Sequence, residues 1–307
     1  MDGFKMKISR SIVTGGAGFI GSNLVDHLVR IGHKVIVIDN FVSGKKANLS
    51  HHKKSDVKVI KLDLSNSKKI DKYFKKIDYV FHLAGLAEII PSIKNPKKYF
   101  NTNVLGTLNV VEAAKKAKVK KFIYAASSSC YGSPKKFPTS EKEKINIQHT
   151  YGLTKYLGEE LVLKYASIFN MPNVSFRFFN VYGPRLNVSG QYSAVFGNFL
   201  KQKESKKPLT IVGDGRQSRD FIHVDDLINA FIKMINSNLV NKVYNLGSGK
   251  ETSINRIANI FGGKKTFISK RPNEPKRSLA NISKIKKDIN WKPLITIQKG
   301  IKRLLKN

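Results

Sequence analysis

A glycine-rich turn near the N-terminus constrains this chain more than any other feature. The segment Thr14-Gly15-Gly16-Ala17-Gly18-Phe19-Ile20-Gly21 follows an apolar run and opens a helical pattern. Glycines at this spacing permit a tight turn, close backbone approach to a pyrophosphate, and close helix–strand packing. The helix N-terminus would direct N–H groups and partial positive charge at the phosphates. The segment therefore predicts a dinucleotide site, with cofactor contacts from Gly15, Gly18, Phe19, Ile20 and Gly21.

An acidic residue at the end of the second apolar run favours one cofactor. Asp39 lies eighteen residues past Gly21 and can accept hydrogen bonds from the adenine ribose hydroxyls. Because a carboxylate there would repel a 2′-phosphate, the expected cofactor is NAD rather than NADP. The neighbouring Asn40 and the pair Asp63-Leu64 after the third run are further expected cofactor contacts. Asp63 could meet the adenine edge or simply cap a helix, and both readings stay open.

Short apolar runs alternate with helical patterns over the first 180 residues. The runs at 8–14, 34–39, 57–61, 79–83, 122–127, 174–178 and 243–246 are expected to be strands. Helices are expected from Phe19 to Ile31, where Gly32 supplies a stop, and over residues 96–117. This alternation predicts an α/β fold, a doubly wound parallel sheet.

The pattern becomes rich in loops after about residue 180 and predicts a smaller, interleaved C-terminal domain. We expect an NAD-binding domain over 1–180, rejoined by about 222–248. Residues 181–221 and 249–307 are expected to bind the substrate.

Composition limits the environment of the chain. Its 307 residues include one cysteine, Cys130, which rules out an intramolecular disulfide and the usual zinc spacings. No metal site is therefore expected. Because no apolar run reaches the length of a membrane span, we expect a cytoplasmic protein that does not enter the membrane.

The chain carries a formal net charge of +35, which raises the question of a nucleic-acid partner. Only ten of the 56 basic residues are Arg, and the Lys residues are spread over the whole chain. Nucleic-acid sites usually show clustering and Arg enrichment. We therefore attribute the charge to lysine at surface positions and expect no nucleic-acid partner.

A tyrosine and a lysine four residues apart indicate a catalytic pair. Tyr151 and Lys155 would share one helix face. An ammonium group nearby, together with a positively charged nicotinamide ring, would lower the pKa of the phenol. Such a Tyr can exchange a proton with a sugar hydroxyl. Ser127, at the end of the fifth expected strand, could hydrogen-bond the same substrate oxygen.

With these motifs the chain resembles the NAD-dependent nucleotide-sugar epimerase/dehydratase family of extended short-chain dehydrogenases/reductases. The resemblance runs from about Lys7 to the C-terminus. Beyond the residues above, it rests on His82-Leu83-Ala84-Gly85, Asn103, Arg177-Phe178-Phe179-Asn180, Gly213-Asp214-Gly215 and the segment from Ser218 to Val224. It implies a catalytic triad of Ser127, Tyr151 and Lys155, with Tyr151 and Lys155 also touching the cofactor. It implies further cofactor contacts from Leu83, Ala84, Gly85, Asn103 and Phe178.

The residues after the fifth strand separate the reactions of this family. Dehydratases carry Thr-Asp-Glu where this chain has Ser127-Ser128-Ser129, and decarboxylases usually keep the Glu. The chain therefore lacks the acid and the base that eliminating water from the sugar would require. Oxidation and re-reduction of the sugar at C4 need neither of them. The resemblance implies a 4-epimerase, with Ser128 and Ser129 on the substrate.

The resemblance also implies the residues that would hold the sugar nucleotide. Arg219, Arg271 and Asn180 match diphosphate contacts, and Glu274 matches a contact to the nucleotide ribose. Arg219 could instead pair with Asp220 or Asp214, and Arg271 could belong to a plain loop.

One position of the family pattern bears on the sugar. Ser278 matches a position where a small residue admits an N-acetyl group, which favours UDP-GlcNAc/UDP-GalNAc, alongside UDP-Glc/UDP-Gal. Lys276 and Arg277 leave a uronate open, since either cation could meet a carboxylate.

Three hypotheses remain at this point. The first is a UDP-hexose 4-epimerase that keeps NAD bound and acts as a homodimer. The second is a UDP-uronate 4-epimerase, a 4,6-dehydratase or a 4-reductase on the same scaffold. The third is a catalytically idle NAD sensor or basic scaffold that contacts nucleic acid, for which DNA binding that survives roughly 200 mM salt would be the sign.

Overall fold

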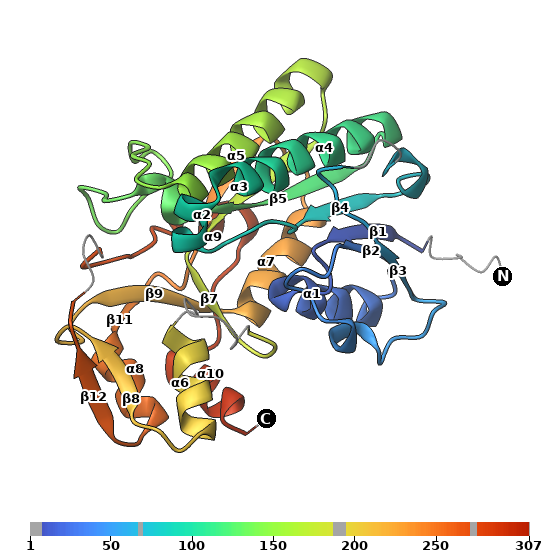
Figure 1. The fold of residues 1–307 in the computed structure, drawn as a ribbon. Helices are drawn as coiled ribbons and strands as arrows, with labels where there is room; N and C mark the ends of the chain where they lie inside the picture. The colour runs from blue at the N-terminus through green and yellow to red at the C-terminus, as the bar shows by residue number, and fades with distance from the viewer. Residues whose placement is uncertain (1–7, 67–69, 187–194, 271–274, 307) are drawn as a thin grey trace. The chain divides into compact units, whose positions relative to one another are not determined.

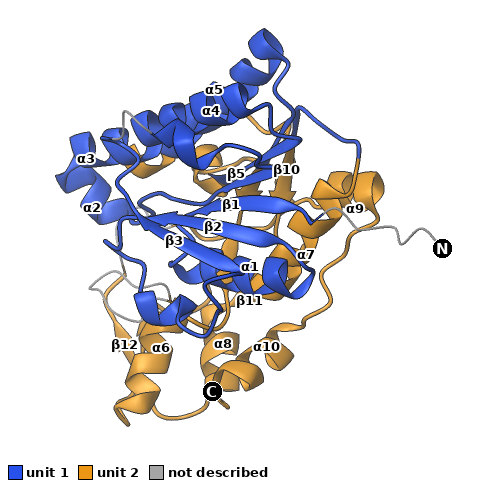
Figure 2. Ribbon diagram, turned by 90° about the vertical axis from the view of Figure 1, so that its right-hand side faces the viewer, with its two compact units in different colours: residues 1–126, 153–175, 238–242 blue, residues 127–152, 176–237, 243–307 orange. Residues whose placement is uncertain are grey.

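A computed structural model of the chain describes residues 8–66, 70–186, 195–270 and 275–306. It has two compact units (Figure 2), each assembled from several chain segments. Unit 1 contains Met1–Ala126, Leu153–Ser175 and Asn238–Lys242, and unit 2 contains Ser127–Gly152, Phe176–Ser237 and Val243–Asn307. The chain crosses between the units within three strands, within one helix, and in a loop at residues 237–238.

A seven-stranded sheet dominates the fold (Figure 1), in the strand order β10-β6-β5-β4-β1-β2-β3. The strands are β1 (Arg10–Thr14), β2 (Lys34–Asp39), β3 (Val57–Lys61), β4 (Tyr79–His82), β5 (Lys121–Ser127), β6 (Asn173–Phe178) and β10 (Lys242–Leu246). β1 pairs in parallel with both β2 and β4, so the strand order reverses between β1 and β4. Ligands of doubly wound sheets bind beyond the strand ends at this switch point.

This sheet confirms the expected doubly wound fold, including the return of the strand at 243–246. The expected limits of β2 and β3 match at both ends, and the others are one or two residues off: β1 begins at Arg10 rather than residue 8, and β4 ends at His82 rather than Leu83. Strand ends are the least well defined positions in any sequence pattern, because fraying residues carry the same apolar signal.

Helices follow the strands of unit 1. They are α1 (Phe19–Arg30), α2 (Ile89–Lys94), α3 (Pro96–Phe100), α4 (Gly106–Ala117) and α5 (Thr150–Phe169), with short turns η1 (Lys46–Leu49) and η2 (Ile70–Tyr73). α1 ends before Gly32, whose φ of +87° confirms the expected stop. The helix expected over 96–117 contains a π-helical turn, η3 (Asn101–Leu105). Such turns are frequent at functional sites.

The core of unit 1 lies between the sheet and these helices. It includes Val80, Phe122 and Tyr124 of the strands and Val110 and Val111 of α4, all 0% exposed. Strands covered on both faces explain why the apolar runs are continuous rather than alternating.

Unit 2 adds shorter elements. A three-stranded sheet has the order β11-β9-β7, and β12 pairs with β8. The strands are β7 (Asn180–Tyr182), β8 (Leu209–Val212), β9 (Ser218–His223), β11 (Glu251–Ser253) and β12 (Lys265–Ile268). The helical elements are η4 (Ser128–Tyr131), α6 (Val195–Glu204), α7 (Val224–Ile235), α8 (Ile254–Phe261), α9 (Ser283–Ile289) and α10 (Ile297–Leu304).

Aromatic side chains form the centre of a second core in unit 2. Tyr182 and Phe196 stack with centroids 4.5 Å apart, and Phe199 and Phe261 meet edge to face at 5.5 Å. These rings stabilise the packing around the short strands β7 and β9, because aromatic pairs attract each other in preferred orientations in addition to burying apolar surface.

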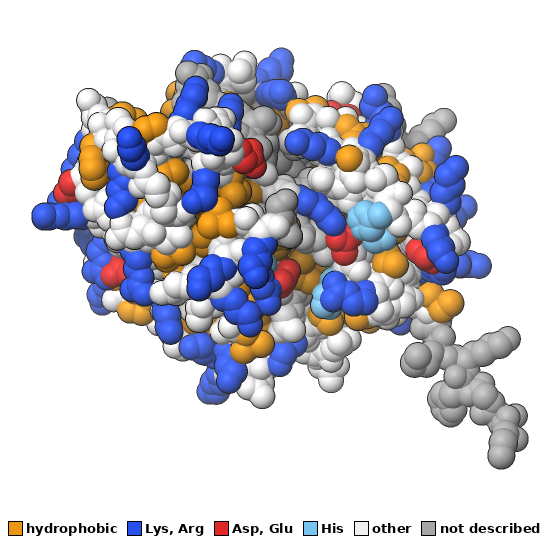
Figure 3. All heavy atoms as spheres, turned by 90° about the horizontal axis from the view of Figure 1, so that it is seen from below, with side chains coloured by type: hydrophobic (Ala, Val, Ile, Leu, Met, Phe, Trp, Pro, Cys, Tyr) orange, Lys and Arg blue, Asp and Glu red, His pale blue; other side chains and the backbone are white. Residues whose placement is uncertain are grey.

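Two surface properties bear on partners. Among the described residues, no helix combines the length and apolar character that crossing a membrane requires. Lys and Arg side chains are scattered over the face in Figure 3 rather than gathered in one stripe.

Candidate active site

The glycine turn of unit 1 connects β1 to α1. Gly15 has a φ of +68°, and a Cβ there would lie 2.8 Å from the backbone N of Ala84. A Cβ on Gly21 would collide with the Gly15 carbonyl oxygen. Gly18, the N-cap of α1, gives the helix no side-chain cap. The first N–H groups of a helix with no capping side chain suit an anionic ligand.

Asp39 lies beside this turn and is 7% exposed. Its Oδ2 accepts a hydrogen bond of 3.0 Å from the N–H of Ala17, and its Oδ1 accepts one of 2.8 Å from the N–H of Phe41. These bonds fix the carboxylate while each oxygen keeps a further lone pair for a ligand hydroxyl. A Cβ on Gly44 would lie 2.9 Å from both oxygens, so glycine keeps this approach clear. The turn and Asp39 fit an adenine dinucleotide without a 2′-phosphate.

Asp63 has two protein partners. Its Oδ1 accepts hydrogen bonds from the N–H and hydroxyl of Ser65 at 2.9 and 2.7 Å, and its Oδ2 accepts one of 3.1 Å from Asn40. The bonds from Ser65 hold the pKa of Asp63 below its usual range. The bonds from Ser65 stabilise the turn that follows β3, while Leu64 is buried in the core.

Asn103 of the π-helical turn η3 joins two chain segments of unit 1. Its side-chain oxygen accepts a 2.8 Å bond from the N–H of Leu86, and its nitrogen donates to the Leu86 carbonyl at 3.1 Å. The same nitrogen donates to the hydroxyl of Thr154 on α5 at 3.0 Å. Asn103 therefore holds the segment after β4, which carries Leu83, Ala84 and Gly85, against the helix that carries Lys155.

A buried chain of hydrogen bonds supports the same segment. The Thr14 hydroxyl meets Nδ1 of His82 at 2.7 Å, and Nε2 of His82 meets the Thr107 hydroxyl at 2.9 Å. The Thr14 hydroxyl also accepts a 3.2 Å bond from the N–H of Ala84. Burial, and secondarily the charge of Lys155, lowers the pKa of His82 to about 3. His82 is thus a neutral structural residue, a role the sequence motif did not indicate.

Lys155 is 7% exposed, within unit 1. Its Nζ lies 4.5 Å from the centroid of the Tyr124 ring and 3.7 Å from the Cβ position of Gly85. Burial lowers the pKa of this ammonium group to about 7, and the charge of Glu159 opposes the shift. Glu159 in turn accepts a 2.7 Å bond from Ser175. A cation held in a dry site is a strong hydrogen-bond donor toward a ligand hydroxyl.

Ser127 and Tyr151 come together in unit 2. The Ser127 hydroxyl lies at the end of β5, accepts a 3.2 Å bond from the N–H of Ser129, and is hydrogen-bonded to Tyr151. Because α5 is continuous, Tyr151 and Lys155 lie one turn apart along one helix face.

The pKa of Tyr151 responds to burial as well as to the neighbouring polar groups. Burial raises the pKa of Tyr151, and the hydrogen bond from Ser127 acts in the lowering direction without overcoming it. The sequence argument considered the charges of Lys155 and of a bound nicotinamide ring, and it did not include the desolvation cost of the phenol.

Ser128 and Ser129 form the turn η4 that follows Ser127. A Cβ on Gly152 would lie 3.0 Å from the carbonyl oxygen of Ser129, so the start of α5 packs closely on this turn. Behind it, the Tyr131 hydroxyl donates to Asn245 at 2.7 Å and accepts from Arg177 at 2.9 Å. This buried network stabilises the serine turn, and sequence reasoning missed its Tyr131 and Asn245.

Among the expected substrate contacts, Asn180 and Arg219 lie on the paired strands β7 and β9. Asn180 donates a 3.1 Å bond to the carbonyl of Asp220. The Arg219 guanidinium donates to the Ser218 carbonyl at 2.9 Å. The carboxylate of Asp220 accepts bonds from Ser248, Gly249 and Ala280, which binds β9 to its neighbours. Phe178, at the end of β6, packs against Phe231 with centroids 5.8 Å apart.

Arg277 is engaged by neighbouring side chains, whereas its neighbour Ser278 is partly open to solvent. Arg277 makes a bidentate pair with Glu251, at 2.8 and 3.0 Å, and its guanidinium lies 4.8 Å from the Phe137 ring centroid. The adjacent Ser278 is partly exposed. Arg271 and Glu274 lie outside the described residues.

Comparisons with known proteins agree with this geometry. A model of the NAD dependent epimerase/dehydratase family matches residues 11–247. A putative UDP-glucose 4-epimerase of Methanocaldococcus jannaschii is 35% identical over 301 residues, 96% of each chain. The solved UDP-N-acetylglucosamine 4-epimerase of Methanobrevibacter ruminantium, a complex with UDP-N-acetylmuramic acid, superposes with a TM-score of 0.91, at 34% identity over 98% of this chain and 99% of that one.

A second solved structure carries a different sugar. The UDP-glucuronic acid 4-epimerase of Bacillus cereus, with UDP-glucuronic acid and NAD, has a TM-score of 0.87 and 33% identity over 95% of this chain and 96% of that one. Together these similarities confirm the family resemblance, NAD as the cofactor and the expectation of an enzyme.

Proposed function

Because the chain belongs to the NAD-dependent epimerase/dehydratase family, we propose that it inverts C4 of a UDP-hexose through a 4-keto intermediate. The observation that carries the proposal is the run Ser127-Ser128-Ser129 beside Tyr151, with serines where an eliminating enzyme needs an acid and a base. Bound NAD would supply a hydride acceptor and donor.

Tyr151 would move the proton. When C4 is oxidised, its hydrogen would leave as hydride and the 4-hydroxyl proton would pass to the Tyr151 phenolate, so the C4–O bond becomes a carbonyl and Tyr151 becomes a neutral phenol. After the keto sugar turns over in the pocket, hydride returns to the opposite face and Tyr151 returns the proton. The Ser127 hydroxyl, bonded to Tyr151, would orient the phenol toward the sugar oxygen.

Lys155 would hold the cofactor and tune this proton transfer. Its ammonium, one helix turn from Tyr151, would contact the nicotinamide ribose and favour the phenolate form. Asn103 would act as a positioning residue for this helix and for the segment from Leu83 to Gly85. The turn residues, Asp39 and Phe178 would complete the cofactor site.

We propose that residues 181–221 and 249–307 bind the sugar nucleotide, with Arg219, Arg271 and Asn180 on the diphosphate and Glu274 on the ribose. The small side chain of Ser278 would leave room for an acetamido group, which favours UDP-GlcNAc/UDP-GalNAc, with UDP-Glc/UDP-Gal as smaller substrates. The solved relative with UDP-N-acetylmuramic acid is an N-acetylated case.

A UDP-uronate is the second candidate, which the Bacillus cereus relative favours. The bidentate pair between Arg277 and Glu251 weighs against it, because it occupies one of the two cations that could meet a sugar carboxylate. Lys276, which is exposed, remains for that role. A 4,6-dehydratase is disfavoured because Ser128 and Ser129 stand where that reaction needs an acid and a base.

We further propose a homodimer in the cytoplasm that makes UDP-sugars for polysaccharide biosynthesis.

To test the proposed epimerisation, purified protein is incubated with UDP-GlcNAc, UDP-Glc or UDP-glucuronate without added NAD, and the products are followed by NMR. The proposal expects a C4 epimer, formed fastest from UDP-GlcNAc. A 4-keto-6-deoxy product, or no epimer from any of the three, would refute it.

A further inference from the structure

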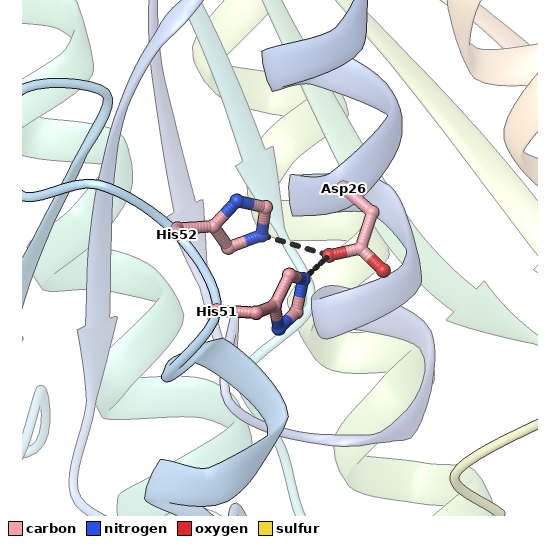
Figure 4. A group of neighbouring side chains, drawn as sticks. All are labelled: Asp26, His51 and His52. Atoms are coloured by element: carbon pink, nitrogen blue, oxygen red, sulfur yellow. Dashed lines mark hydrogen bonds and ion pairs between the residues drawn. The ribbon is translucent and has the colours of Figure 1, made fainter.

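Two adjacent histidines of unit 1 point at one carboxylate (Figure 4). Asp26 lies on α1, and His51 and His52 follow the turn η1. Nε2 of His51 lies 3.0 Å and Nε2 of His52 lies 2.8 Å from the same Oδ1 of Asp26. Neither the sugar chemistry nor the cofactor site uses these residues.

The donor atoms have the chemistry and spacing of a metal site. One ligand atom from each residue lies within 4.8 Å of the others. Imidazole nitrogen and carboxylate oxygen bind Zn²⁺ at about 2.0–2.2 Å, so neighbouring ligands of a tetrahedral ion lie about 3.4 Å apart. The observed distances need small shifts of side chains to reach that value. The ion would take the Nε2 lone pairs, with the ring protons on Nδ1.

The burial of the three residues suits an ion that enters from solvent. The His52 side chain is 8% exposed and Asp26 25%, whereas His51 is 49% exposed. Two ligands are therefore held by packing and the third can swing to admit the ion. With three protein ligands, the fourth position would hold water.

From this juxtaposition we propose that Asp26, His51 and His52 form a surface site for a divalent transition-metal ion of the zinc type. The single cysteine and the spacing of the histidines gave no sequence signal for it, because the carboxylate lies 25 residues away in the chain. The net charge of +35 repels any cation, so affinity must come from the coordination bonds.

A bound ion would link α1 to the segment after η1. The turn η1, which directly precedes that segment, already contacts the glycine turn, because the N–H of Lys45 at its start and the side chain of Asn48 within it both donate to the Ala17 carbonyl, at 3.0 and 2.8 Å. Metal binding would therefore stabilise the part of unit 1 that surrounds the dinucleotide turn.

The test is calorimetric titration of tag-free, EDTA-treated full-length protein with ZnCl₂. We expect one ion per chain, with affinity weakened about tenfold or more in Asp26→Asn and in His52→Ala. His27→Ala, which changes the neighbour of Asp26 on the same helix, should bind like the unaltered protein. Thermal melting should rise with ZnCl₂ in the unaltered protein and in His27→Ala.

Co²⁺ gives a readout that needs no variant. The unaltered protein should show the strong visible absorption of four-coordinate Co²⁺, and ZnCl₂ should abolish it. The proposal is wrong if Zn²⁺ shows no saturable binding, or if binding persists in a chain with Asp26→Asn, His51→Ala and His52→Ala combined.

Discussion

The side-chain amide of Asn103 donates a 3.0 Å hydrogen bond to the hydroxyl of Thr154, the residue that precedes Lys155 on α5. The same side chain pairs with both backbone groups of Leu86. One buried amide from a π-helical turn thus fixes the segment after β4 and the helix that carries Lys155. Its loss should affect both stability and turnover.

Asn103→Ala should lower the free energy of unfolding by about 2–3 kcal/mol, because it removes the three hydrogen bonds that the Asn103 side chain makes to Leu86 and Thr154. The measurement is urea unfolding of the cofactor-free protein. Asn109→Ala is the matched control, since Asn109 makes one partly buried bond, to the Leu64 carbonyl. Equal losses in the two variants would contradict the positioning role.

Lys155 should make stability depend on pH. Its pKa in the folded chain is lowered to about 7. Between that pH and the ordinary lysine range, the unfolded chain binds the proton and the folded chain does not, so stability rises with pH. The slope contributed by one group is at most about 1.4 kcal/mol per pH unit.

The check compares urea unfolding of the unaltered protein and Lys155→Met from pH 6 to 9, without cofactor. The stability of the unaltered protein relative to the variant should increase above pH 7 and stay level below it. A difference that is constant over this range would show that Lys155 is not desolvated as described.

Asp39 should set the choice of cofactor. Asp39→Asn removes the charge and one of the two backbone bonds, so we expect NAD to bind about tenfold more weakly and the preference for NAD over NADP to shrink. Calorimetric titration with each cofactor measures both effects. Asp56→Asn alters a partly exposed acid paired with Lys34 and should leave both affinities unchanged. An unaltered preference in Asp39→Asn would count against the assigned contact.

Ser278 should decide which sugars enter. Ser278→Tyr fills the space proposed for the acetamido group, so kcat/KM for UDP-GlcNAc should fall by about tenfold or more while that for UDP-Glc changes little. Ser283→Tyr, at the exposed start of α9, should change neither value. Parallel losses on both sugars would mean that position 278 does not select the substrate.

The glycine turn, Asp39 and the strand pattern could be predicted from sequence because local periodicity and backbone requirements specify them. The role of Asn103 could not, because its bond to Thr154 spans 51 residues and depends on a π-helical turn. The bonds of Asp63 to Ser65 and Asn40 could not be predicted either, because the bond to Asn40 joins residues that are 23 positions apart. The pairing of Arg277 with Glu251 could not be predicted from sequence, because the two residues are 26 positions apart in the chain.

The central claim is that hydride leaves C4 and returns to the same carbon within one bound complex. The direct measurement uses UDP-GlcNAc carrying deuterium at C4, incubated in ordinary water without added NAD, and follows the label in the product by NMR and mass spectrometry. We predict a C4 epimer that keeps its deuterium, and no product from Tyr151→Phe, while the matched Tyr165→Phe on the same helix remains active. An epimer that has exchanged its label for solvent hydrogen would contradict the account.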